Sequence, residues 1–214
     1  MYLKFLFRTR KLKDKFTQFY RNNSFEGQES VSGKGSDLIQ TAIIRVAIPK
    51  LFEKLNTKIF IDAPCGDFFW MKQVDLKDVN YIGLDIVDEI IKKNTELFGN
   101  SKRQFIRKNI VSDKLPDADV ILIRDCWVHL NNEHIFKSIM NLKRSNITYL
   151  LTTSFPGLNI NQELKAIWRP INLELAPYNF PKPIEVINEG CTEDEGKYVD
   201  KSLILWKISE LPEF

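Results

Sequence analysis

From Lys58 onward, the hydrophobic pattern alternates short apolar runs with stretches of helical spacing. The runs predict buried strands at Ile59–Ala63, Tyr81–Leu84, Phe105–Ile106, Val120–Ile123 and Ile147–Thr152. Helices are expected at Asp37–Leu55, with Ser36 as a cap, and at Phe68–Val74, Val87–Phe98 and Glu133–Leu142. Alternation of this kind predicts a parallel sheet with helices on both faces.

The pattern changes after the fifth predicted strand. Residues Pro156–Pro183 contain five prolines and several aromatic residues, which favours an irregular substrate lid over regular structure. The runs Ile184–Ile187 and Ser202–Ile208 flank the polar turn Cys191–Lys197 and predict a terminal antiparallel hairpin. We therefore expect an α/β fold with a mostly parallel seven-stranded sheet, formed by a single domain at residues 32–214.

Residues 1–31 differ from this domain and form a predicted basic arm. Met1–Asn23 carries seven lysines and arginines against the single acid Asp14. Phe5, Leu12, Phe16 and Phe19 recur at spacings that suit one face of a helix. We expect this stripe to pack on the chain's own domain or on a second copy of the chain, and the alternative is docking to a membrane surface or to nucleic acid.

Composition narrows the class of protein. A hydrophobic fraction of 43% and a charged fraction of 28% over 214 residues are typical of a globular domain. No apolar run is long enough to span a bilayer, and the arm lacks the apolar segment of a secretory signal. Cys65, Cys126 and Cys191 are too far apart for a metal knuckle, so we expect a cytoplasmic protein without a bound metal.

Two strand ends carry the most informative chemistry. The first strand runs through Asp62 into a tight turn that contains Gly66. The second ends at Asp85, 19 positions after Gly66. This is close to the ~20-residue spacing at which an acid reaches the ribose hydroxyls of a bound adenosine. Because ligands of such sheets bind at the carboxyl ends of the strands, both turns are candidates for one site.

These motifs resemble the class I S-adenosylmethionine-dependent methyltransferases. The strand with D-x-x-x-G, the acid that closes the next strand and the terminal hairpin carry the likeness. Asp62–Asp67, Tyr81–Asp85, Arg124–Leu130 and Asn188–Cys191 further resemble a bacterial group with a D-x-P-C-G-D motif, often associated with surface-polysaccharide genes. The likeness extends from about residue 32 to residue 208 and implies the Rossmann-like methyltransferase fold.

The resemblance implies S-adenosylmethionine as cofactor. Asp85 would bind its ribose, Gly66 would approach its methionine part, and Asn109 and Ile110 would hold its adenine. The positions that match the family's cofactor site are Asp62, Pro64, Cys65, Gly66, Asp67, Asp85, Ile86, Asn109, Ile110 and Arg124. Any of them could instead only cap its own strand or turn.

The first turn departs from the family pattern, because Pro64 and Phe68 stand where the broad family has glycines. Proline fixes φ and phenylalanine adds bulk, so we expect a stiffer turn than a glycine-rich loop would give. The same departure argues against a dinucleotide-dependent dehydrogenase, which needs those glycines for approach of the pyrophosphate.

The fourth strand leads into Arg124–His129, beside the expected position of the transferred methyl group. Asp125 or His129 could remove a proton from a hydroxyl acceptor, although His129 could equally be a structural residue at a helix start. The polar and aromatic residues expected around the acceptor are Lys34, Trp127, Trp168, Arg169 and Lys201. For any single one of them, we expect an ordinary surface role more than a functional one.

We therefore expect a methyltransferase that acts on a polar small molecule or a saccharide, at oxygen, in surface or capsular polysaccharide biosynthesis. Two alternatives remain open. One is a methyltransferase-like binding module without catalysis, which binds a partner or a membrane surface through the basic arm; the arm could also form a homo-oligomer or another surface contact. The other is a nucleic-acid or protein methyltransferase, although the net charge of only +3 is accounted for by the arm and does not imply nucleic acid.

Overall fold

The architecture centres on a twisted sheet. The computed structural model describes the backbone of residues 2–214 and the side chains from Lys11 onward. In this part of the chain, seven strands pair in the order β3-β2-β1-β4-β5-β7-β6. They are β1 (Ile59–Asp62), β2 (Asn80–Asp85), β3 (Arg103–Arg107), β4 (Ala118–Ile123), β5 (Ile147–Ser154), β6 (Glu185–Asn188) and β7 (Ser202–Lys207).

Five of these strands are parallel to one another, and β7 pairs antiparallel with both β5 and β6. The predicted parallel sheet and the predicted terminal hairpin are therefore confirmed. The segment between β5 and β6 contains no helix or strand, which agrees with its prolines. No helix within the described residues has both the length and the apolar content needed to cross a membrane.

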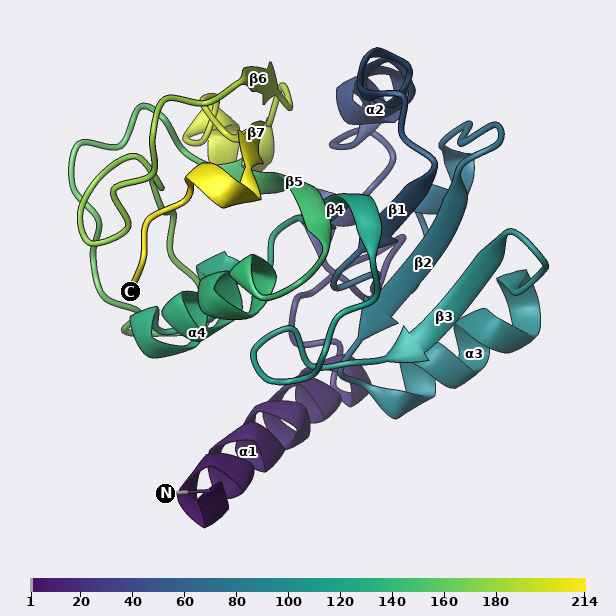
Figure 1. The fold of residues 1–214 in the computed structure, drawn as a ribbon, viewed down its shortest axis with the longest axis horizontal. Helices are drawn as coiled ribbons and strands as arrows, with labels where there is room; N and C mark the ends of the chain where they lie inside the picture. Colours follow the sequence, from purple (N-terminus) through teal and green to yellow (C-terminus); the bar gives the residue numbers. More distant parts are fainter. Residues whose placement is uncertain (1) are drawn as a thin grey trace.

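Helices cover both faces of the sheet (Figure 1). They are α1 (Tyr2–Arg21), α2 (Ala42–Leu55), α3 (Asp88–Phe98) and α4 (Asn132–Lys143). Val120 and Leu122 of β4 belong to the same apolar cluster as Ile48 of α2. Ile121, also of β4, belongs to the cluster on the other face of the sheet, together with Ile139 of α4. Burial on both faces explains why the central strand β4 is apolar from Val120 to Ile123.

The prediction of a helix at Phe68–Val74 is wrong. The structure has only a three-residue 3-10 turn at Met71–Gln73. Gly66 and Phe68 both have left-handed backbone conformations, with φ of 51° and 60°. An α-helix cannot begin through residues in that conformation, so the chain leaves β1 through an irregular turn.

The helix expected at Asp37–Leu55 begins later, at Ala42. Ser36 is not its cap, because it belongs to a separate 3-10 turn at Lys34–Ser36. The Thr41 hydroxyl, which precedes α2, donates to the Asp37 carbonyl 3.0 Å away rather than accepting from the helix. Thr41 thus precedes the helix with a non-helical ψ of 2° and makes no side-chain capping bond.

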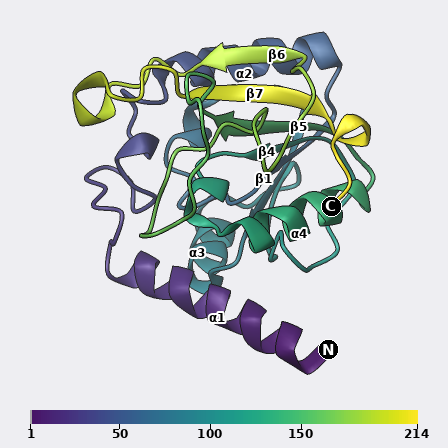
Figure 2. The same ribbon diagram turned by 90° about the vertical axis from the view of Figure 1, so that its left-hand side faces the viewer.

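The basic arm forms a helix that lies across the carboxyl ends of the strands (Figures 1 and 2). Leu12 is buried in the core cluster of the α4 face. Lys13 pairs with Asp88, and the Arg21 Nε atom donates to Glu89 2.9 Å away. The helix thus packs on its own domain at the start of α3, while Phe5 lies outside the residues whose side chains are described.

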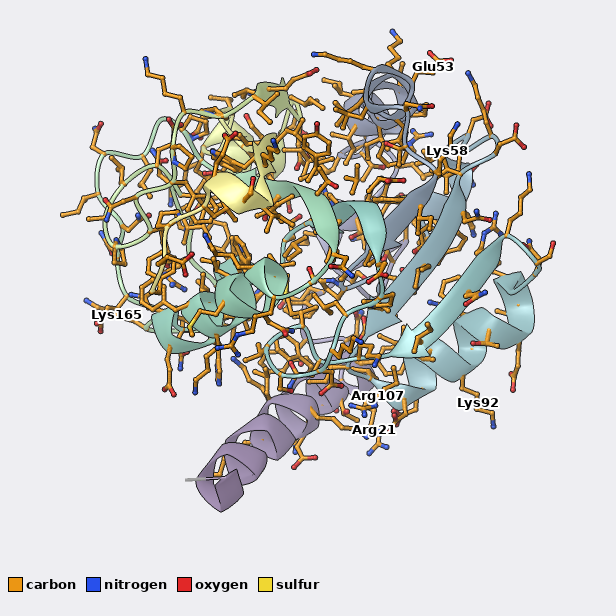
Figure 3. The ribbon with its side chains drawn as sticks, in the orientation of Figure 1. Arg21, Glu53, Lys58, Lys92, Arg107 and Lys165 are labelled. Carbon is orange, nitrogen blue, oxygen red and sulfur yellow. The ribbon has the colours of Figure 1, made fainter. Side chains whose placement is uncertain are left out.

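Three residues labelled in Figure 3 help to locate the two ends of the sheet. Figure 3 labels Lys58 just before β1 and, toward the opposite end of the sheet, Arg21 of α1 and Arg107 of β3. The carboxyl ends of the parallel strands therefore meet the α1 side of the molecule. This is the side on which the polar residues singled out by the sequence gather.

The hairpin strand β7 should contribute strongly to stability because its Leu205 side chain is fully buried. We expect Leu205→Ala to lower the free energy of unfolding by about 2–5 kcal/mol, through lost apolar burial and the cavity left behind. Val186 of the neighbouring strand is 50% exposed, so Val186→Ala should cost less than about 1 kcal/mol. Urea denaturation followed by circular dichroism measures both, and equal losses would contradict the packing described.

Candidate active site

Two adjoining cavities open at the carboxyl ends of the strands. The strand-end cavity lies over the ends of β1, β2 and β4 and is covered by Leu12, Phe16 and Tyr20 of α1. The lid cavity lies beside it, between Ser24–Glu26, the irregular segment after β5 and the start of β7. Four residues line both cavities, so the two spaces meet there: Phe25, Ser32, Asp125 and His129.

The turn after β1 packs closely against the loop that contains Ser32. At Gly66 a Cβ atom would stand only 2.2 Å from the Ser32 hydroxyl oxygen, and φ is 51°. The position therefore requires glycine. Asn94 of α3 donates to the Gly66 carbonyl 2.8 Å away, which holds the turn from the other side.

Pro64 and Phe68, which stand where the broad family has glycines, both fit into this turn. The Phe68 ring is buried and packs against Tyr81 and Phe105, at centroid distances of 5.0 and 5.3 Å. Its bulk therefore points into the core and not into the strand-end cavity. Pro64 lines that cavity, and the next residue, Cys65, donates its N–H to the Leu84 carbonyl 2.8 Å away.

Asp85 joins the first two strand ends. Its carboxylate accepts from the Gly66 N–H at 3.2 Å and from the Val87 N–H at 2.9 Å. Burial raises the pKa of Asp85 to about 6, even though both backbone bonds lower it. Since a carboxylate has about four acceptor positions, two remain for a hydroxyl donor in the cavity.

Asp62, at the end of β1, is 3% exposed and accepts a hydrogen bond from the Tyr81 hydroxyl at 2.8 Å. Burial raises its pKa to about 7 against the opposing effects of that bond and of Arg124. A buried acid of this kind becomes ionised readily when a cation is placed beside it. The strand-end cavity thus has a group suited to an ammonium.

Asp67 and Asn109 are occupied in holding loops. Asp67 accepts from Ser30 Oγ at 2.8 Å and from the Val31 N–H at 3.0 Å, so it fixes the loop that follows α1. Asn109 accepts from the Val111 N–H at 3.0 Å and shapes the turn after β3. Both line the strand-end cavity, but their oxygens already have these partners.

A buried ion network lies where the two cavities meet. Arg124, after β4, donates through Nη2 to Glu189 and to the Gly35 carbonyl, both 2.7 Å away. The Arg124 guanidinium also lies 5.4 Å from the centre of the Trp70 ring. Glu189, after β6, is 2% exposed. This network therefore links β4, the hairpin and the Gly35 loop.

Asp125 belongs to the same network. Its carboxylate lies 2.7 Å from the Lys201 ammonium and 3.3 Å from the Arg124 guanidinium. Burial by itself would raise the pKa of Asp125, but Lys201 and Arg124 outweigh it and lower the pKa to about 2. So acidic a group is a poor acceptor of protons at neutral pH.

His129 has the opposite properties. Its Nδ1 atom lies 2.6 Å from the Ile167 carbonyl oxygen, which can only accept, so Nδ1 carries a proton. Burial lowers the pKa of His129 below its ordinary value, so the ring is neutral near pH 7 and Nε2 has a free lone pair. The Phe25 ring, 4.8 Å away, packs against the imidazole. The arrangement suits a general base between the two cavities.

The structure brings most of the candidate residues together. All ten candidates for cofactor binding line the strand-end cavity, and Lys34, Trp168 and Lys201 line the lid cavity. Trp127 and Arg169 line neither: Trp127 is 1% exposed and packs against Phe180, and Arg169 donates to the Leu130 carbonyl at 2.6 Å. These two residues pin the irregular segment to the domain instead.

Sequence reasoning missed several residues of the site. The arm and the loop after it contribute Leu12, Phe16, Tyr20 and Phe25 to the cavities, although the aromatic stripe was a signal that the arm packs somewhere. Glu189 stood inside a recognised motif without an assigned role. Within the described residues no three His, Cys, Asp or Glu side chains are grouped to hold a metal ion.

Comparison with known proteins identifies the fold class. No family model matches the sequence, and no curated protein matches it. The structure is similar to magnesium protoporphyrin IX methyltransferase from Synechocystis PCC 6803 with bound S-adenosylhomocysteine, at 13% identity and TM-score 0.62, covering 93% of this chain and 99% of that one. It is also similar to 1,6-didemethyltoxoflavin-N1-methyltransferase from Burkholderia thailandensis, at 14% identity and TM-score 0.59, covering 94% and 88%.

A third similar structure is human N-acetylserotonin methyltransferase in complex with S-adenosylmethionine, at 12% identity and TM-score 0.56. The match covers 78% of this chain and 52% of the human chain, so the chain spans about half of that protein's length. Together with the strand order, these likenesses show that the chain has the Rossmann-like class I methyltransferase fold. The fold class implied by the sequence is confirmed.

The buried pair of Arg124 and Glu189 generates a stability prediction. Glu189→Gln leaves a buried guanidinium with less compensation, so we expect the free energy of unfolding to fall by about 3 kcal/mol. The control is Glu185→Gln, which breaks the 2.6 Å pair with Lys54 on the surface and should cost less than about 1 kcal/mol. Chemical denaturation measures both, and similar losses would show that the network does not hold the site.

Proposed function

We propose that the chain is an S-adenosylmethionine-dependent methyltransferase that binds its cofactor in the strand-end cavity. The observation that carries the proposal is the convergence of the ten candidate residues on one cavity at the carboxyl ends of β1, β2 and β4. The fold is shared with methyltransferases crystallised with S-adenosylmethionine or S-adenosylhomocysteine. The position of the cavity and the fold thus support the same cofactor.

The residues of the cavity fit the parts of this cofactor. The Asp85 carboxylate retains acceptor positions for the ribose hydroxyls. Gly66 lines the cavity at the turn after β1, where the resemblance places the amino-acid part of the cofactor. Asp62 can ionise beside the ammonium group. Asn109 and Ile110 border the end of the cavity beyond β3, where the resemblance places the adenine.

His129 is the proposed general base. S-adenosylmethionine supplies an activated methyl group, so the protein must align the acceptor and remove its proton. His129 Nε2 would take the proton of the acceptor hydroxyl while that oxygen gains the methyl group, and the imidazolium then returns the proton to water. Asp125 is better suited to holding Lys201 at the boundary of the two cavities, since its pKa is about 2.

The acceptor is proposed to be a polar small molecule or a saccharide, methylated at oxygen in the lid cavity. The polar and aromatic lining of this cavity supports such an acceptor. A role in surface or capsular polysaccharide biosynthesis rests on the sequence resemblance alone. Residues 156–183 would serve as the acceptor lid, because Trp168 and Ile167 of this segment line the cavity.

Calorimetric titration with S-adenosylmethionine tests the cofactor assignment. We expect saturable binding to the wild-type protein and loss of most of the affinity in Asp85→Ala, because the ribose loses its acceptor. Circular dichroism should show that the variant is folded, and exposed Asp75→Ala is the matched control with unchanged affinity. Binding that is absent from the folded wild type would reject the enzyme in favour of a methyltransferase-like binding module.

Cofactor affinity should depend on pH through Asp62. The acid is protonated below its pKa of about 7, and a bound ammonium favours its ionised form, so binding releases a proton. We expect affinity to weaken as the pH falls through 7, by about tenfold between pH 8 and pH 6. Asp62→Asn should flatten this dependence, whereas affinity that rises toward acid pH would contradict the assignment.

His129→Gln should separate chemistry from binding. Loss of the base should lower turnover by roughly 10²–10⁴-fold while the affinity for S-adenosylmethionine stays unchanged. Release of S-adenosylhomocysteine with any acceptor that supports turnover provides the assay. In the wild type, turnover should rise with pH through a pKa below the ordinary histidine value. Unchanged turnover in the variant would mean that no base at this position is needed.

A further inference from the structure

The lid cavity determines what kind of acceptor can be methylated, an inference that rests on the proposed function. It adjoins the strand-end cavity and shares Asp125 and His129 with it. A molecule held in the lid cavity can therefore present a hydroxyl to His129 on one side and to the methyl donor on the other. The charges and rings of the remaining lining then select among hydroxyl compounds.

One wall of the lid cavity is aromatic. Trp168 lies 5.0 Å from Tyr198 and 5.9 Å from Phe155, and Tyr198 lies 5.8 Å from Phe155, all edge to face. Phe155 is buried, whereas Trp168 and Tyr198 are partly exposed. Such rings offer apolar surface to the flat side of a cyclic molecule, and the Lys197 ammonium lies over the Tyr198 ring, 5.2 Å from its centre.

The positive charges of the lid cavity are already paired. Lys201 lies 2.7 Å from Asp125, 3.7 Å from Glu193 and 3.8 Å from Glu189. Lys34 lies 3.9 Å from Glu26. These are the two lysines among the described residues that line the cavity, and the lining contains no arginine. Lys201 is therefore compensated by three carboxylates, whereas Lys34 and Glu26 form a solvent-exposed pair.

The negative charges exceed these cations. Asp125, Glu26, Glu193 and Asp194 line the cavity, so four carboxylates face two ammonium groups while His129 is neutral. Asp194 is exposed on the turn before β7, next to the aromatic wall that Tyr198 completes. The lining therefore carries a formal excess of two negative charges, offset in part by the Lys197 ammonium beside Tyr198, and this excess favours cations over anions.

We propose that the acceptor is a cyclic hydroxyl compound that bears an ammonium group and no acidic group, such as an amino sugar. Its ring lies along Trp168, its ammonium faces Asp194 and Glu193, and one hydroxyl faces His129. The same charges disfavour phosphorylated sugars, uronic acids and nucleic acid as acceptors. Trp168 and Asp194 are then specificity residues for the reaction.

The test compares three rings of matched size and different charge. The protein is first saturated with S-adenosylhomocysteine, and glucosamine, glucose and glucuronate are then titrated by calorimetry at low ionic strength. We expect glucosamine to bind at least about tenfold more tightly than glucuronate, with glucose between them, and the preference to shrink as salt is added. Equal or tighter binding of glucuronate, or no binding of glucosamine, overturns the proposal.

Two neighbouring acids provide matched variants. Asp194→Asn should weaken glucosamine by about two- to fivefold, since the group is exposed and screened, and should leave glucose unchanged. Glu195→Gln removes the adjacent exposed carboxylate, which does not line the cavity, and should alter neither affinity. Trp168→Ala should weaken glucosamine and glucose together. An Asp194→Asn protein with full preference for glucosamine contradicts the proposed placement of the ammonium.

The first step of the experiment separates this inference from the proposed function. Failure of S-adenosylhomocysteine to bind the folded protein would overturn the cofactor assignment and, with it, the identification of the lid cavity as an acceptor site. Normal binding of S-adenosylhomocysteine followed by a preference for glucuronate would leave the methyltransferase assignment standing. It would overturn only the inferred charge of the acceptor.

Discussion

The buried ion pair between Arg124 and Glu189 is the interaction on which the site depends. Removing two charges from water is costly, and the cost is offset here by short hydrogen bonds and by further partners. Those partners come from β4, from the terminal hairpin and from the Gly35 backbone. One network therefore fixes the relative position of three segments that are far apart in the sequence.

The network also assigns different properties to two adjacent candidates. The Asp125 carboxylate is held beside Lys201 and Arg124, and these cations keep its pKa near 2. His129 lies only four positions later, but burial lowers its pKa and its Nδ1 atom donates to the Ile167 carbonyl. Environment, more than residue type, thus separates a structural acid from a potential base.

Much of this arrangement was predictable from the sequence. The strands follow from apolar runs, and the shared location of Gly66 and Asp85 follows because parallel strands place their carboxyl ends at one edge. The prediction of a short helix after β1 was wrong because a hydrophobic pattern does not reveal the positive φ values at Gly66 and Phe68. Ion partners such as Glu189 were equally inaccessible, since pairing across 65 positions depends on the tertiary fold. The same holds for Trp127 and Arg169, whose polar and aromatic character did not reveal that they pack in the interior.

The central claim is that the strand-end cavity binds S-adenosylmethionine, and a crystal structure of the protein with S-adenosylhomocysteine tests it most directly. The account predicts ribose hydroxyls within hydrogen-bond distance of the Asp85 carboxylate, the amino-acid part beside Gly66 and Asp62, and the sulfur facing the boundary that His129 forms with the lid cavity. Density for the ligand at any other place, or with its ribose away from Asp85, would contradict it.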